Sequence, residues 1–155
     1  MMNQTDNIKY IARNRKARHD YQITDTVEAG IELLGSEVKS LREGKVNISD
    51  AYALVENNQV FLRNLHISPY KMAGLDNHDP LRVRRLLLHK REIRKLFSKT
   101  EQKGMTLIPL AIYFKKNLVK IELGVALGRK KYDKRQAIAK NEADRKIKSA
   151  LKKDL

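Results

Sequence analysis

The residues of this chain best suited to chemistry are its lysines and arginines, which gather in three clusters. The sequence of 155 residues holds 33 Lys and Arg against 18 Asp and Glu, which gives a formal net charge of +15. The clusters span residues 13–18, 82–95 and 129–153, and the first consists of Arg13, Arg15, Lys16 and Arg18. Clustered cations contact phosphates and release counterions from a nucleic acid. One such cluster is as readily a solvated face, but three in a small chain predict a nucleic-acid partner.

A search for catalytic and metal-binding patterns finds little. The seven glycines are scattered, and neither G-x-S-x-G nor H-E-x-x-H occurs. His78 with Asp76 and Asp79 imitates a metal cluster, but its position just before a predicted helix start favours an ordinary loop. Cysteine is absent, which excludes disulfides and thiolate chemistry. We predict no catalytic residue, no metal and no cofactor; a nuclease that assembles carboxylates from distant strands stays open as an alternative.

The sequence also argues against a membrane partner. No apolar run approaches the roughly 18 residues that a membrane-spanning helix needs. The first residues, MMNQTDN, contain no apolar signal region. Together with the lack of cysteine, this predicts a cytoplasmic protein.

Aromatic side chains fall into two groups. Tyr21, Tyr52, Tyr113 and Phe114 lie in predicted strands, and we interpret them as core residues. Tyr132 instead lies among cations with no core to join, which favours stacking on a nucleobase. Its neighbours form the rest of a predicted contact segment: Lys130, Lys131, Asp133, Lys134 and Arg135. Asp133 is interpreted as a recognition or charge-patterning residue rather than a general base.

Hydrophobic periodicity sets out the elements that must position these residues. Alternation predicts strands over 21–33, 51–55, 60–65, 105–114 and 119–127. The first is one long strand or two joined at a bend near Gly30. A short helix is expected from Ser36 to Gly44, and a long one over 81–102 that Asp79 and Pro80 would start. Residues 1–11 are expected to be loose.

These elements predict a mainly β fold with some α: a small, closed, antiparallel barrel of six strands. An OB-like barrel with flanking helices is the favoured form, because closure hides the sheet edges and such barrels commonly bind nucleic acid. Residues 1–128 would form the barrel. Residues 129–155 would form a basic tail, too charged to order alone but with Ala139, Ala143 and Ile147 at helical spacing.

Four longer stretches carry a family resemblance. NRKARHDY, EAGIELLGSEVKSLREGKVNISDAYA, DPLRVRRLLLHKREI and GVALGRKKYDKR stand in the order and spacing of the small protein B family, the SsrA-binding proteins of bacteria. The resemblance runs from about residue 8 to the end. It implies an OB-like barrel, no enzymatic activity, and binding to the tRNA-like part of transfer-messenger RNA. It also implies delivery of that RNA to stalled ribosomes in trans-translation, which tags the incomplete peptide.

The resemblance carries RNA-binding roles to Asn14, Glu28, Leu87 and Lys120. Lys120 has the wrong parity for the core, so it is expected to face out toward phosphate. Glu28 cannot hold phosphate, but it can accept from a base edge or a 2′-OH, or orient an arginine. Leu87 is expected to support the surface.

Further implications concern the tail and the partners. In the family the tail is disordered when free and becomes helical on the ribosome, where it occupies the decoding centre and the message channel. Many members have His where this chain has Tyr132, so stacking is kept and the titratable charge is lost. Expected partners are the small ribosomal subunit with its rRNA, and elongation factor Tu and alanyl-tRNA synthetase through the RNA; a monomer is expected. The rival interpretation is a generic structured-RNA or ribosomal protein with a basic extension.

Overall fold

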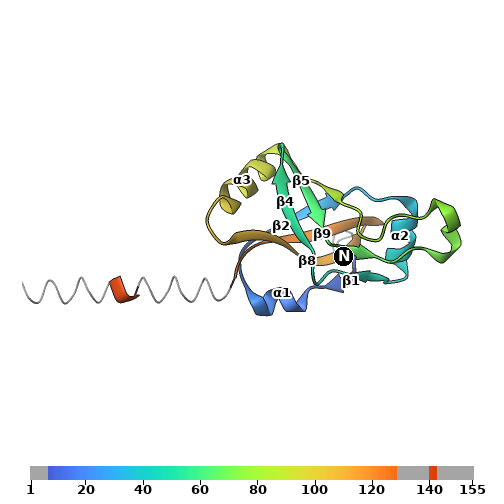
Figure 1. The fold of residues 1–155 in the computed structure, drawn as a ribbon, viewed down its shortest axis with the longest axis horizontal. Coiled ribbons are helices and arrows are strands. Elements are labelled where there is room, and N and C mark those ends of the chain that lie inside the picture. The colour runs from blue at the N-terminus through green and yellow to red at the C-terminus, as the bar shows by residue number, and fades with distance from the viewer. Residues whose placement is uncertain (1–6, 129–139, 143–155) are drawn as a thin grey trace, which may run out of the picture.

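A computed structural model describes residues 7–128 and 140–142 of the chain. Within them, an antiparallel sheet of seven strands runs in the order β1-β8-β4-β5-β7-β2-β9, and a further pairing joins β8 to β9. This pairing closes six of the strands into a ring, close to a barrel, as predicted (Figure 1). The strands of the sheet are β1 (Ile8–Arg13), β2 (Tyr21–Ile31), β4 (Tyr52–Glu56), β5 (Gln59–Arg63), β7 (Arg84–Leu87), β8 (Met105–Lys115) and β9 (Leu118–Gly128).

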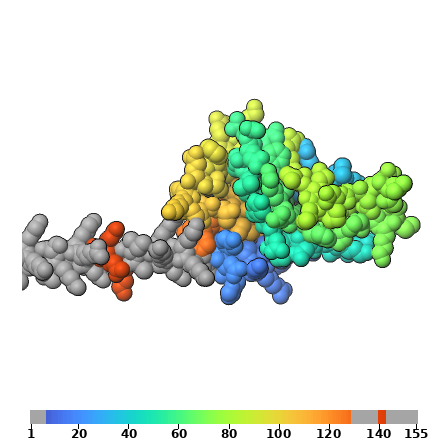
Figure 2. All heavy atoms as spheres, viewed as in Figure 1, coloured from blue at the N-terminus to red at the C-terminus, as the bar shows by residue number. Residues whose placement is uncertain are grey.

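Shorter elements surround the ring. Strands β3 (Val46–Asn47) and β6 (His66–Ile67) pair with each other, and a 3₁₀ segment spans Lys71–Asp76. The helices are α1 (Arg15–Asp20), α2 (Gly35–Arg42) and α3 (Lys90–Thr100). In Figure 1, α2 and α3 lie at opposite ends of the barrel, and in Figure 2 the blue atoms of α1 form a ridge along one side.

The main core fills the inside of the ring. Inward residues of the strands pack there with Leu41 of α2 and with Ile93 and Leu96 of α3. A second, smaller core lies outside the ring, where Ala17 of α1 packs on Ile108, Leu110 and Ala126 of β8 and β9. The helix α1 is therefore fixed to the outer surface of the barrel, and its exposed side is free to carry charge.

Two hairpin turns each contain two consecutive residues with positive φ. Asn57 and Asn58 have φ of 50° and 61°, and Lys116 and Asn117 have φ of 50° and 63°. Two consecutive residues with positive φ give the type I′ turn, whose twist matches that of antiparallel strands. The β4–β5 and β8–β9 strand pairs are therefore joined by tight two-residue turns.

The predicted long helix over 81–102 is wrong in its first half and confirmed over residues 90–100. Its first half is strand β7, which pairs with β2 and β5, and the helix α3 begins only at Lys90. Asp79 does accept a hydrogen bond from the Leu81 backbone, but this makes a turn rather than a helix start. The actual N-terminus is stabilised by Glu92, whose carboxylate accepts from the His89 backbone at 3.0 Å.

A buried ion network explains why the sequence pattern did not predict strand β7. Arg84 is fully buried and donates from Nε to the Glu37 carboxylate and from Nη1 to the Leu65 carbonyl at 2.7 Å. Arg82 donates to Glu37 Oε1 at 2.6 Å. An arginine thus occupies an inward strand position that alternation assigns to an apolar residue. Burial raises the pKa of Glu37, but hydrogen bonds from Arg82, the Leu34 amide and Arg84 outweigh it, so the pKa lies below its ordinary value.

Three local predictions also need correction. Residues 8–11, expected to be loose, form the first part of β1 along β8. The irregularity in β2 lies between Ile23 and Asp25 rather than at Gly30, which pairs regularly. The helix α2 begins after Leu34, and Ser36 bonds to His78 instead of capping the helix. Gly44, with φ of 72°, does end that helix as predicted.

Candidate nucleic-acid interface

Strand register brings distant residues into one row across the outside of the barrel. Lys120 pairs with Gly30 and with Tyr113, Gly30 also pairs with Leu87, and Tyr113 pairs with Tyr10. Residues directly opposite each other project from the same face of a sheet. Their chain neighbours Ala29 and Ile121 are buried in the main core, so this row faces outward. Lys120 therefore has the outward orientation that its parity predicted.

A second row runs beside the first. Glu28 pairs with Glu122, Glu122 with Ala111, and Ala111 with Arg13. We use the name outer wall for the side chains of the two rows other than the buried Ala111: Tyr10, Arg13, Glu28, Leu87, Tyr113, Lys120 and Glu122. The predicted residues Glu28, Leu87 and Lys120 thus come from three strands to one surface.

Glu28 is held in place by hydrogen bonds. The Tyr113 hydroxyl donates to Glu28 Oε2 at 2.5 Å, and the Lys115 ammonium lies 3.3 Å from both carboxylate oxygens. The hydrogen bond from Tyr113, followed by the contributions of Lys115 and Lys120, lowers the pKa of Glu28 despite some burial. Burial and the neighbouring carboxylate raise the pKa of Tyr113. At neutral pH the pair is therefore a phenol donating to a carboxylate, and Glu28 keeps lone pairs for an external donor.

An aromatic platform lies at the edge of the same wall. The Arg13 guanidinium stacks 4.0 Å from the centre of the Tyr10 ring, and the Tyr10 and Tyr113 rings lie 5.5 Å apart. Tyr10 is 45% exposed. Tyr10 was not predicted as a site residue because residues 1–11 were expected to be loose. Tyr113 is buried, as predicted, with 5% of its surface exposed, but its hydroxyl reaches Glu28 on the outer wall.

Leu87 lies over a glycine. A Cβ atom placed on Gly30 would come within 3.2 Å of Leu87 Cβ and 3.5 Å of Leu87 Cδ1. The absence of a side chain at Gly30 therefore leaves the space that Leu87 occupies, although Leu87 itself remains 45% exposed. An apolar contact point is thus built beside Lys120.

Asn14, which the resemblance assigns to RNA binding, does not face solvent. Its side chain is 3% exposed: Oδ1 accepts from the Ala17 amide at 3.0 Å, and Nδ2 donates to the Pro109 carbonyl at 3.0 Å and to the Ile48 carbonyl at 3.4 Å. The residue caps α1 and ties it to β8.

The helix that Asn14 caps presents the first basic cluster. Arg15, Lys16 and Arg18 are exposed. Arg18 reaches Glu122 on the outer wall at 3.3 Å, and Lys16 reaches Asp50 at 3.9 Å. The basic side of α1 therefore adjoins the outer wall through Arg18.

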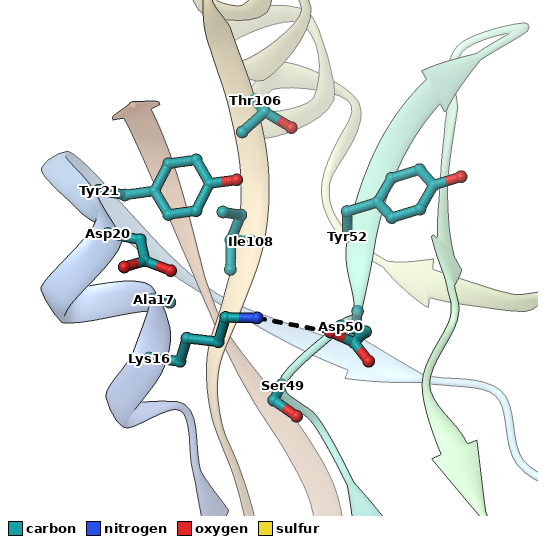
Figure 3. A pocket seen from close by; sticks show the side chains of 10 residues that line it. Lys16, Ala17, Asp20, Tyr21, Ser49, Asp50, Tyr52, Thr106 and Ile108 are labelled. Atoms are coloured by element: carbon teal, nitrogen blue, oxygen red, sulfur yellow. Dashed lines mark ion pairs between the residues drawn. The ribbon is translucent and has the colours of Figure 1, made fainter. Parts of the chain in front are cut away.

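A pocket of about 320 Å³ opens on the other side of α1. Tyr21 and Tyr52 lie on opposite sides of it, Asp20 lies beside Tyr21, and the Lys16–Asp50 ion pair runs below the two rings (Figure 3). Tyr21 and Tyr52 are half-buried and line the pocket. Tyr21 packs against the second core and Phe114 against the main core, as predicted, whereas Tyr52 belongs to neither core. Tyr21 pairs with Gly128, so the pocket lies beside the last residue of β9.

The remaining candidates have simpler positions. His78 bonds to Ser36 Oγ at 2.8 Å and to the Ile67 carbonyl at 2.9 Å, which satisfies both ring nitrogens within the loop. Among the described residues there is no group of three potential metal ligands and no helix long and apolar enough to cross a membrane. The predicted tail residues Lys130, Lys131, Tyr132, Asp133, Lys134 and Arg135 lie outside the described residues.

The ring of strands with its polar outer wall and adjoining cationic helix defines a class: a small, OB-like, RNA-binding barrel protein. Residues 11–153 match the family model of the SmpB protein. The chain therefore belongs to the SmpB family, the SsrA-binding proteins, which bind RNA and are not enzymes.

Relatives and a solved structure agree with this assignment. The chain is 63% identical over 147 residues to the SsrA-binding protein of Halothermothrix orenii, covering 95% of each chain. It is 60% identical over 144 residues to that of Alkaliphilus oremlandii, covering 93% of each. A chain of the structure "tmRNA-SmpB: a journey to the center of the bacterial ribosome" matches with a TM-score of 0.65 and 52% identity, over 76% of this chain and 82% of that one.

Proposed function

We propose that this protein binds the tRNA-like domain of transfer-messenger RNA on its outer wall and delivers that RNA to stalled ribosomes for trans-translation. The observation that carries the proposal is the pair of cross-strand rows. They bring Glu28, Leu87 and Lys120, distant in the sequence, onto one exposed surface. The similarity to SsrA-binding proteins and to a chain of a tmRNA–ribosome structure supports the choice of RNA.

The chemistry of the wall suits folded RNA. Lys120 supplies a phosphate contact, and its affinity contribution is independent of base sequence. Glu28, fixed by Tyr113 and Lys115, accepts a hydrogen bond from a 2′-OH or a base edge, which distinguishes RNA from a simple polyanion. Leu87 offers an apolar contact beside the cation. Asn14 acts indirectly, because it holds α1 where Arg15, Lys16 and Arg18 meet further phosphates.

A division of labour completes the proposal. Residues 1–128 form the RNA-binding barrel, and residues 129–155 form a tail that enters the decoding centre and the empty message channel. Within the tail, Tyr132 stacks on a base of ribosomal RNA while Lys130, Lys131, Lys134 and Arg135 meet phosphates and Asp133 assists recognition. The protein acts in the cytoplasm as a monomer, and it meets elongation factor Tu and alanyl-tRNA synthetase through the RNA.

One experiment separates this function from the generic RNA-binding alternative. The full-length protein is captured from a bacterial lysate, and the bound RNA is sequenced beside that of Lys120→Ala. Strong enrichment of a single transfer-messenger RNA, reduced by Lys120→Ala, supports the proposal. Broad recovery of ribosomal RNA without that enrichment supports the alternative, and shortened RNA in the bound fraction supports a nuclease.

A further inference from the structure

The exposed side of α3 carries four cations that no residue of the outer wall neutralises. Lys90, Arg91, Arg94 and Lys95 are all exposed, and none has an ion pair among the described residues. At 3.6 residues per turn they cover about 140° of the helix circumference. Ile93 and Leu96, on the opposite side, are buried in the main core. We call these four residues the α3 face.

The α3 face works against the stability of the free protein. Lys90 and Arg91 lie in the first turn, where the helix dipole favours acidic side chains. Lys90 and Arg94, and likewise Arg91 and Lys95, are like charges four residues apart, an arrangement that destabilises a helix. The acidic residue of this helix, Glu92, is engaged at the N-terminus with the His89 backbone. Local features that oppose folding are typical of functional sites, so we interpret these like charges as a binding site for an anionic partner.

We propose that the α3 face is a second contact surface for the phosphates of the same RNA that the outer wall binds. Charge complementarity identifies a polyanion. The position of the α3 face next to the outer wall indicates that this polyanion is the RNA bound by the wall. Leu87 of the outer wall precedes Lys90 by three residues, so their Cα atoms lie within about 11 Å of each other. The two pairs of cations, each about 6 Å apart along the helix axis, extend the binding surface from the wall onto the end of the barrel.

A double variant tests the inference, which rests on the proposed function. Arg91→Gln/Arg94→Gln breaks both like-charge pairs and keeps good helix formers. The matched control, Arg42→Gln/Lys71→Gln, removes the same charge from exposed residues of α2 and the 3₁₀ segment, at the other end of the barrel (Figure 1). Binding of both full-length proteins to the transcribed tRNA-like part of transfer-messenger RNA is measured against salt, and melting temperatures are recorded.

Affinity and stability are expected to change in opposite directions. The α3 variant should bind RNA at least about fivefold more weakly than the control, with a salt slope smaller by about 0.7–0.9 for each phosphate that is no longer neutralised. Its melting temperature should equal or exceed that of the wild type. Equal RNA affinity of the variant and the control overturns the inference, and so does a loss of affinity that appears only with ribosomes. A fall in melting temperature also overturns it, because the face would then be structural.

The wall serves as an independent comparison. Lys120→Ala is measured in the same assay. If Lys120→Ala binds normally while the α3 variant does not, the proposed site on the wall is wrong and the α3 face stands. If only Lys120→Ala loses affinity, the proposed function stands and this inference fails.

Discussion

The Tyr113 hydroxyl and the Glu28 carboxylate, on strands β8 and β2 of the barrel, are joined by a hydrogen bond of 2.5 Å across the intervening strand β9. This hydrogen bond sets the direction in which Glu28 presents its remaining lone pairs. Tyr113, for which we propose no contact to RNA, thereby determines the orientation of Glu28, for which we do propose one.

Removing the Tyr113 hydroxyl should weaken RNA binding without unfolding the barrel. In Tyr113→Phe the ring packing is kept, but Glu28 loses its main positioning partner and its pKa rises toward the ordinary value. A partly exposed bond of this kind contributes about 1 kcal/mol, so affinity should fall roughly fivefold. The measurement is RNA binding at pH 7. Tyr52→Phe is the control, since its hydroxyl has no hydrogen bond to the residues that the structure describes and the Tyr52 ring lies outside the wall.

The pH dependence of stability provides a second readout for Tyr113→Phe. The native pKa of Glu28 lies below its ordinary value of 4.5. The resulting stabilisation is therefore present above about pH 4.5 and disappears as the pH falls through the lowered native pKa. The stability difference between wild type and Tyr113→Phe should be present at neutral pH and shrink on acidification. A difference that stays constant from pH 7 to pH 3 would assign the effect to packing instead.

Gly30→Ala should damage the wall locally. The added Cβ meets Leu87 Cβ at 3.2 Å, so Leu87 or the β2–β7 pairing must shift. We expect a cost of about 1 kcal/mol in unfolding free energy and a several-fold loss of RNA affinity. Gly35→Ala, where nothing lies within 4 Å of the added atom, should change neither by a comparable amount. Wild-type affinity in Gly30→Ala would remove Leu87 from the proposed contact surface.

Much of this wall follows from simple alternation, and its exceptions have physical causes. Glu28 and Lys120 were predictable as outward residues because Ala29 and Ile121 beside them are apolar. Tyr113 was not, because the register of β8 shifts between Pro109 and Ala111 in its pairing with β9 and the parity changes there. A bulge of this kind leaves little signal in a chain of apolar residues such as 107–114.

Charged residues inside the protein account for the largest error in the fold. The run from Arg82 to Leu88 is typical of an amphipathic helix if each arginine is assigned to solvent. Arg84 is instead buried against Glu37, a residue 47 positions earlier in the chain. Only the tertiary structure supplies that partner. The burial of Asn14 could not be predicted from the sequence either, because its hydrogen bonds to Pro109 and Ile48 join segments far apart in the chain.

The Glu37 network should behave as a buried charge cluster. Glu37→Gln leaves the fully buried Arg84 without its counter-ion and should destabilise the protein by about 3–5 kcal/mol. Replacing both partners, as in Glu37→Leu/Arg84→Met, should recover a large part of that loss, because no uncompensated charge remains inside. Denaturant unfolding of the three proteins measures this. A double variant that is no more stable than Glu37→Gln would show that the ion pair is not the coupled unit.

Truncation after Gly128 should separate RNA binding from peptide tagging. Both cores are built from residues before Gly128, where β9 ends, so the shortened chain should melt within a few degrees of the full-length protein. The outer wall and the α3 face remain, so affinity for the tRNA-like RNA should be largely kept at moderate salt. Tagging of peptides on stalled ribosomes, measured in a single round, should be lost because the tail that we place in the decoding centre is gone. A truncated chain that melts far earlier, or that loses RNA affinity, would show that the division at Gly128 is wrong.

Substitutions of Tyr132 in the full-length chain test whether the function of the tail depends on this aromatic ring. Tyr132→Ala should keep RNA binding and ribosome association but stop tagging, whereas Tyr132→Phe and Tyr132→His should keep most activity because each preserves a flat ring for stacking. Tagging at the wild-type rate in Tyr132→Ala would refute the stacking role. Failure of Tyr132→Phe would instead assign the function to the hydroxyl as a hydrogen-bond partner of ribosomal RNA.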